Sequence, residues 1–107
     1  MSERTLREEM QRRILVLDGA MGTMIQRAAP EEYLWHGNPE MLNLTSPELI
    51  KDIHRAYIAA GVDIIETNSF SANSISQAEY GCASEAGKMA FEAARLALEA
   101  ANAAPRK

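Results

Sequence analysis

The sequence has 107 residues, enough for one small domain with a single hydrophobic core. Apolar residues make up 47% of it and aromatic residues only 6%, so the core must be mainly aliphatic, which favours helices over a β-sandwich. The formal net charge of −4 disfavours nucleic acid and anionic membrane surfaces as partners.

The first predicted elements are a charged helix, a buried strand and a second helix. Residues Thr5–Arg12 carry interleaved charges of both signs, as a solvated helix face does. The run Ile14–Leu17 is continuously apolar, as expected of a strand buried on both faces. After Asp18, apolar residues recur at helical spacing from Met21 to Ala28. The sequence therefore predicts a strand that leads directly into a helix.

A loop and a capped helix come next. The irregular stretch Pro30–Ser46 is rich in turn residues and is predicted to be a connection. Thr45–Glu48 matches a capping box, and Ser46 before Pro47 fits equally well as a helix cap. Gly61 stands where a left-handed residue ends a helix. The predicted apolar face of this helix comprises Leu49, Ile50, Ile53, Ala56, Tyr57 and Ala60.

The remaining residues predict a second strand and a long helix. Val62–Ile65 is short and β-branched, and the helix before it would make the two strands a parallel, right-handed βαβ unit. The polar stretch Asn68–Gln77 leads to an amphipathic helix over Ser84–Ala103. The predicted fold class is α/β, a partial (β/α)8 TIM barrel with its first two βα units and an extra N-terminal helix. Since a whole barrel takes about 250 residues, we expect residues 1–107 to be an N-terminal fragment.

The candidate binding residues follow the two predicted strands, because ligands of α/β folds bind beyond the carboxyl ends of strands. The carboxylate of Asp18 suits an ammonium group, and the free N–H groups of the following helix suit a carboxylate, so the pair suits an amino acid. The alternative is that Asp18 only caps the helix and Gly19 only permits a turn. The second strand ends in more polar side chains than a turn needs, namely Glu66, Thr67, Asn68 and Ser69.

Other reactive side chains have structural explanations. His36 and His54 lack a second ligand at metal-binding spacing, and Cys82 lacks an adjacent base. A single cysteine also excludes an internal disulfide, so we expect no metal site in this chain. Because the sequence contains no signal-peptide core and no apolar run long enough to span a bilayer, we expect a cytoplasmic location.

Three stretches of the sequence are distinctive: RILVLDGAMGTMIQ (residues 13–26), NLTSPELIKDIHRAY (43–57) and GVDIIETNSF (61–70). Together they resemble the start of the homocysteine S-methyltransferase barrel, the homocysteine-binding module of methionine synthase and its relatives. The likeness runs from about Arg13 to Ala100. Only the loop Pro30–Glu40 is shorter than in cobalamin-dependent methionine synthase.

The resemblance implies transfer of a methyl group to the thiol of homocysteine, which gives methionine. In the family, a zinc ion activates the thiol by lowering its pKa. Carried over by motif, Asp18 and Gly19 hold the amino-acid end of homocysteine, with help from Thr67. The residues that would line the rest of the pocket are Gly22, Thr23, Glu66 and Asn68.

The family holds its zinc with three cysteines, one in an Asn-Cys pair and two in a Gly-Gly-Cys-Cys stretch, and neither motif occurs in this sequence. The resemblance therefore implies zinc for the complete enzyme but no metal ligand and no catalytic residue here. Cobalamin and methyltetrahydrofolate are possible through other domains, and S-methylmethionine and betaine are alternative methyl donors. We expect this chain to be inactive alone and to need the rest of the barrel or another copy.

Two other functions remain open from the sequence. A partial barrel with exposed strand edges fits a non-catalytic module that self-association or a partner chain completes. A small α/β protein could also bind amino acids through Asp18 and Thr67 alone. In every case we expect these two residues at neighbouring strand ends, with their side chains in one cleft.

Overall fold

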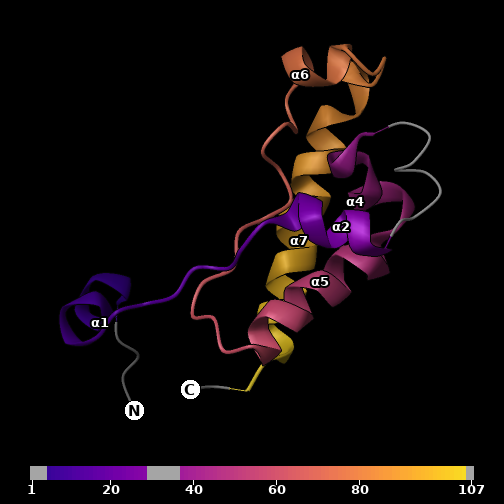
Figure 1. Ribbon diagram of the computed structural model, residues 1–107. Helices are drawn as coiled ribbons and strands as arrows, with labels where there is room; N and C mark the ends of the chain where they lie inside the picture. The colour runs from indigo at the N-terminus through magenta and orange to yellow at the C-terminus, as the bar shows by residue number, and fades with distance from the viewer. Residues whose placement is uncertain (1–4, 29–36, 106–107) are drawn as a thin grey trace.

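The computed structural model describes residues 5–28 and 37–105, and this part of the chain is built from helices (Figure 1). The α-helices are α1 (Leu6–Arg12), α2 (Met21–Ala28), α4 (Leu42–Thr45), α5 (Pro47–Ala59), α6 (Ser74–Ala78) and α7 (Ala86–Ala103). Two 3-10 helices, η1 (Pro39–Met41) and η2 (Ala83–Glu85), precede α4 and α7. No strand forms within the described residues, so the predicted partial (β/α)8 barrel with two βα units is wrong.

The two apolar runs that were expected to form parallel strands are extended segments joined by one isolated parallel bridge, between Leu17 and Ile64. The backbone N–H of Asp18 donates to the carbonyl of Ile64 over 3.0 Å, and that of Asp63 donates to the carbonyl of Val16 over 2.8 Å. The N–H of Val16 donates to the side-chain Oδ2 of Asp63 instead of a backbone carbonyl, over 2.9 Å. The ladder therefore stops after a single bridge.

The sheet does not form because no other described element buries the apolar side chains of the first extended segment. Ile14 is 90% exposed, and Val16 and Leu17 are each about half exposed. A parallel strand is stable when both of its faces are buried and neighbours pair with its edges. The described elements do not supply that cover, so apolar residues of high β-propensity remain in an extended segment.

The core lies where α4 and α5 pack against the long helix α7 and where α2 packs on α5 (Figure 1). Ile50 and Ile53 of α5 and Leu96 of α7 are buried, as their helical spacing predicted. Ile25 of α2 and Leu42 of α4 complete the cluster. Burying one such side chain contributes about 1.5–3 kcal/mol, so this cluster is the main source of stability.

The predicted limits of α5 are close to the observed ones. Ser46 is its N-cap and Pro47 is its first residue, which confirms the second of the two predicted starts, although the side chain of Ser46 makes no capping hydrogen bond. Thr45 belongs to α4 and is not the cap of α5. Gly61 follows the helix with φ at 103°, in the left-handed region that favours glycine. Ala56 and Ala60 are exposed, so the buried face is narrower than predicted.

Short helices replace part of the two stretches that were predicted to be irregular. η1 and α4 occupy residues 39–45, whereas residues 30–36 of the predicted loop lie outside the described ranges. α6 begins inside the predicted polar stretch, and the side chain of its N-cap Asn73 accepts a hydrogen bond from the N–H of Ser76 over 2.8 Å. Elements this short span too few residues for hydrophobic periodicity to reveal them.

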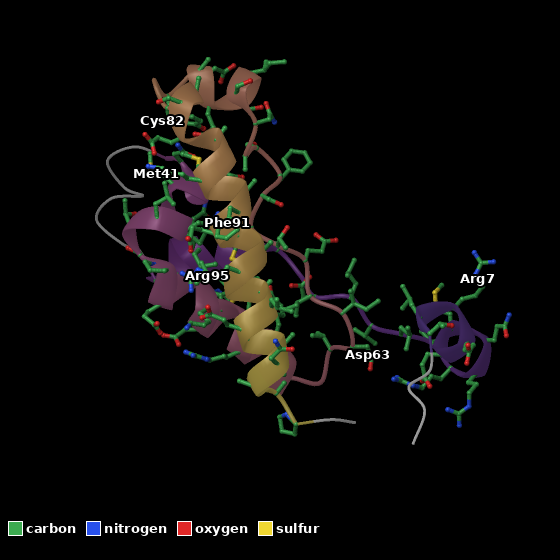
Figure 2. All side chains as sticks on the ribbon, turned by 180° about the vertical axis from the view of Figure 1, so that it is seen from behind. Arg7, Met41, Asp63, Cys82, Phe91 and Arg95 are labelled. Atoms are coloured by element: carbon green, nitrogen blue, oxygen red, sulfur yellow. The ribbon has the colours of Figure 1, made fainter. Side chains whose placement is uncertain are left out.

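α7 confirms the predicted amphipathic helix and is the long helix on which α4 and α5 pack (Figure 1). Its buried residues are Ala86, Met89, Ala93, Leu96, Ala97 and Ala100. Phe91 and Arg95 lie on its other side, where Figure 2 shows them, and Phe91 is 69% exposed. Across residues 5–28 and 37–105, no helix combines the length and the apolar character that a bilayer crossing requires.

α1 confirms the predicted N-terminal helix but stands apart from the core, at the end of an extended segment (Figure 1). None of its residues is buried. The hydroxyl of Thr5 caps it by accepting a hydrogen bond from the N–H of Glu8 over 3.2 Å. The projection makes the molecule long: its radius of gyration is 15.1 Å, where a compact chain of this length has about 13 Å.

Candidate functional site

A cavity of about 480 Å³ lies beside the point where the two extended segments meet. Its lining comes from three separate parts of the chain: residues 18–22, 39–40 and 66–70. Cavities that bind small molecules usually measure about 300–1,000 Å³, so this cavity has the size for a ligand such as an amino acid.

The cavity gathers nearly all the residues predicted for the site. Those that line it are Asp18, Gly19, Gly22, Glu66, Thr67 and Asn68. Thr23 does not line the cavity and is exposed on α2. The expected strands are absent, so a single backbone bridge and side-chain hydrogen bonds hold the two motifs together.

The side chain of Asp18 links the two motifs through a hydrogen bond. Both of its carboxylate oxygens lie close to the backbone N–H of Glu66, with Oδ2 at 3.2 Å and Oδ1 at 3.3 Å. α2 begins only at Met21, so Asp18 does not cap this helix, and its structural partner is the N–H of Glu66 instead. The carboxylate thus serves a structural purpose while it also lines the cavity.

The two glycines after Asp18 have different roles. A Cβ at Gly19 would lie 3.0 Å from the hydroxyl oxygen of Tyr57, so this glycine permits a close approach of α5. The same hydroxyl donates to the carbonyl of Ala20 over 3.0 Å and holds the turn from behind. A Cβ at Gly22 would meet nothing within 4 Å, so the missing side chain there leaves room in the cavity.

The start of α2 provides hydrogen-bond donors at the cavity wall. Met21 and Gly22 are its first two residues, and both line the cavity. The first N–H groups of a helix have no acceptor within the helix and carry a partial positive charge, which attracts carboxylates. One wall therefore favours a negatively charged group, while Asp18 and Glu66 favour a positively charged one.

Glu40 is a buried acidic residue of the lining that sequence analysis missed. It lies on η1, is 4% exposed, and its Oε1 accepts a hydrogen bond from the N–H of Ser71 over 3.1 Å. Glu40 lies in a loop of turn residues without hydrophobic periodicity, so the sequence did not indicate that its side chain is buried. The sequence feature that could have drawn attention to it is an acidic residue directly after Pro39, where a helical turn can begin.

Two buried asparagines, Asn43 and Asn68, hold the segments around the cavity together through amide hydrogen bonds. The Nδ2 of Asn43 donates to the carbonyls of Asn68 and Met89, over 2.8 and 3.1 Å. The Nδ2 of Asn68 donates to the Oδ1 of Asn43 over 3.1 Å and to the carbonyl of Pro39 over 2.9 Å. The amide of Asn68 therefore holds the 66–70 segment against η1 and α4, and the amide of Asn43 links this group to α7.

The outer part of the cavity is lined by hydroxyls and one aromatic ring. The hydroxyl oxygens of Thr67 and Ser69 form a hydrogen bond of 2.5 Å. Phe70 also lines the cavity and is 98% exposed. The cavity is thus acidic at Asp18, Glu40 and Glu66 and partly apolar towards Phe70.

The described residues do not fit the zinc ion that the resemblance implies. They contain no group of three His, Cys, Asp or Glu side chains that could hold a metal ion. The thiol of Cys82 donates to the carbonyl of Tyr80 over 3.4 Å. Figure 2 shows Cys82 near the α6 end of α7, far from the largely buried carboxylate of Asp63, which lies beside the segment that leads to α1. We therefore derive no chemical step that passes through a metal.

Among models of known protein families, that of the homocysteine S-methyltransferases matches residues 15–107 of this sequence. The match starts within the first apolar run and includes α2, α5 and α7. It also includes all three parts of the chain that line the cavity.

Proposed function

Because this chain belongs to the homocysteine S-methyltransferase family, we propose that it is the homocysteine-binding part of an enzyme that methylates the homocysteine thiol to methionine. The observation that carries the proposal is the cavity shared by the two motifs. Asp18 and Thr67 are far apart in the sequence and line the same cavity. The family acts on homocysteine, and the lining has the charges that an amino acid requires.

In this proposal Asp18 accepts hydrogen bonds from the α-ammonium group of homocysteine. A hydrogen bond between two charged groups is stronger than a neutral one, which makes a carboxylate a suitable ammonium partner. The N–H groups of Met21 and Gly22 receive the α-carboxylate, and Thr67 adds a hydroxyl donor. Gly19, Glu66 and Asn68 shape the pocket, and Gly22 leaves space for the substrate.

The activation of the thiol is proposed to come from outside this cavity. The lining contains carboxylates, hydroxyls and an amide but no cysteine or histidine, so it supplies no soft metal ligand. A zinc site would then be contributed by another part of the enzyme or by a partner chain. A methionine synthase of the cobalamin type would further use cobalamin and methyltetrahydrofolate on other domains.

A second candidate is an amino-acid-binding module without methyl transfer. The observation that favours it is the acidic cavity itself, which suits the ammonium group of any α-amino acid. The two proposals differ in selectivity, because an enzyme for homocysteine must distinguish it from methionine and cysteine. Binding constants for the three amino acids therefore separate them.

The test is calorimetric titration of the whole chain with homocysteine. In Asp18→Asn the remaining carbonyl oxygen still accepts from the N–H of Glu66, but the negative charge is lost. We expect the affinity to fall by roughly ten- to a hundredfold, because a hydrogen bond to a charged group contributes about 1.5–3 kcal/mol.

The matched control is Asp52→Asn, which removes an exposed carboxylate that pairs with Arg55 on α5. It should leave the affinity unchanged. Equal binding by the parent chain and Asp18→Asn, or no binding of homocysteine by the parent chain, would refute the proposal.

A further inference from the structure

Glu40 is a largely buried acidic residue whose carboxylate makes little use of its capacity to accept hydrogen bonds. Glu40 is 4% exposed and lines the cavity beside Pro39. Its Oε1 accepts one hydrogen bond, from the N–H of Ser71. Within the described residues this is the one hydrogen bond that the carboxylate of Glu40 makes. Its Oε2 is not a fully enclosed atom, so this oxygen is open to the cavity that Glu40 lines.

A carboxylate that accepts one hydrogen bond keeps free acceptor capacity, because its two oxygens can accept about four hydrogen bonds. Asp18 likewise has one backbone donor, the N–H of Glu66, which lies within reach of both of its oxygens. Both carboxylates therefore keep acceptor capacity for a ligand in the cavity that they line.

An ammonium group fits these acceptors better than a metal ion does. An ammonium carries three N–H donors, so it can bond to Glu40 and Asp18 at the same time. A divalent cation requires several ligands that converge, and the described carboxylates do not form such a group. The N–H groups at the start of α2 line the same cavity and suit the carboxylate that an α-amino acid carries next to its ammonium.

We propose that Glu40 is a second ammonium-binding residue, whose Oε2 accepts a hydrogen bond from the α-ammonium group of the substrate. This inference rests on the proposed binding of homocysteine, and it adds that the site selects ligands with a free primary amine. With Glu40 and Asp18 together, the cavity should reject analogues without the amine far more strongly than Asp18 alone would allow.

The experiment compares two ligands on matched proteins by calorimetry. The ligands are homocysteine and 4-mercaptobutanoate, which is homocysteine without its ammonium group. Glu40→Gln keeps an oxygen that accepts from the N–H of Ser71 and removes only the charge. We expect it to bind homocysteine about tenfold or more weakly than the parent chain and to bind 4-mercaptobutanoate equally well. Glu79→Gln, at an exposed carboxylate outside the cavity, should change neither affinity.

Two results would overturn the inference: an unchanged homocysteine affinity in Glu40→Gln, or an equal loss for both ligands, which indicates a structural role for Glu40. If Glu40→Gln does not fold, Asp18→Asn gives an independent answer. A remaining preference for homocysteine over 4-mercaptobutanoate in Asp18→Asn supports Glu40, and no preference overturns it.

The same titrations separate this inference from the proposed function. If the parent chain binds homocysteine and Glu40→Gln binds it equally well, only the role of Glu40 is wrong. If the parent chain binds neither ligand, the proposed function fails and the role of Glu40 fails with it.

Discussion

At the residue scale, carboxylates take the place of backbone acceptors where the two extended segments meet. Asp63 accepts from the N–H of Val16 and pairs with Arg13 over 3.0 Å, and its side chain is only 8% exposed. Asp18 accepts from the N–H of Glu66 one position beyond the bridge. The contact between the two extended segments therefore depends on side-chain as well as backbone hydrogen bonds.

His54 is the other residue with an unusual environment, because it is fully buried and neither ring nitrogen has a hydrogen-bond partner among residues 5–28 and 37–105. Burial lowers its pKa from the ordinary 6.5, since the charged form loses its hydration, and the negative charge of Asp18 opposes this shift only in part. A folded pKa below 6.5 means that the unfolded chain binds more protons between the two values. The contribution of His54 to stability is then fully present above pH 6.5 and decreases as the pH falls towards the lowered folded pKa.

We predict that His54→Leu removes this part of the acid sensitivity. Each unit of pKa depression corresponds to about 1.4 kcal/mol of stability that is lost on acidification. Denaturant unfolding at several pH values between 7 and 5 should show a parent chain that weakens faster than the variant. Parallel decreases in the two proteins would show that His54 titrates normally.

At the scale of elements, α5 and α7 hold the molecule together through one apolar interface and an ion pair. The Nζ of Lys51 on α5 lies 2.9 Å from a carboxylate oxygen of Glu99 on α7, and this ion pair links the two helices beside their apolar interface. Hydrogen bonds from Lys51 and Arg95 lower the pKa of Glu99, but the group lies at the surface and solvent screens the pair. The buried side chains must therefore provide most of the energy.

We predict that two leucines of α7 differ strongly in their contribution. Leu96 is 1% exposed in the core cluster, whereas Leu98 is 60% exposed on the opposite face. Leu96→Ala should lower the free energy of unfolding by about 2–5 kcal/mol, because it removes buried contacts and leaves a cavity. Leu98→Ala is the matched control and should change it by about 0.5 kcal/mol or less. Similar losses in the two variants, measured by denaturant unfolding, would contradict this packing.

At the scale of the whole molecule, the chain divides into a packed body and a projecting arm. The arm comprises α1 and the extended residues 13–17, and its apolar side chains are largely exposed, with Leu6 at 58%, Met10 at 63% and Ile14 at 90%. Its described ties to the body are the bridge at Leu17 and the hydrogen bonds around Asp63. Local opening of such a region requires little free energy, because few buried contacts are lost.

We predict that amide hydrogen exchange separates the two parts. The amides of α1 should exchange with little protection, whereas those in the middle of α5 and α7 should exchange only through unfolding of the whole body. Residue-resolved exchange measured by NMR provides the comparison within one sample. Protection of α1 that equals the protection of α7 would mean that the arm is packed in solution.

The longer helices were predictable from the sequence because their signals are local, whereas the short helices η1, α4 and α6 were not. The spacing of Ile50 and Ile53, the position of Pro47 and the glycine at position 61 are visible in the sequence, and each acts within one or two helical turns. The strands were not predictable in the same way. The run Ile14–Leu17 has the continuous apolar character of a buried strand. A strand also needs other elements that cover its faces and pair with its edges, and these come from distant parts of the chain.

The sequence by itself determined the long helices, the centre of their buried faces and the family, since residues 15–107 match it. Only the tertiary structure decided that the two motifs meet without a sheet and that Glu40 joins them from η1. The reason is physical: a helix is held by bonds between residues four apart, whereas a cavity is defined by contacts between residues distant in the chain. Hydrogen bonds such as the one from the N–H of Glu66 to Asp18 exist only once the chain has folded.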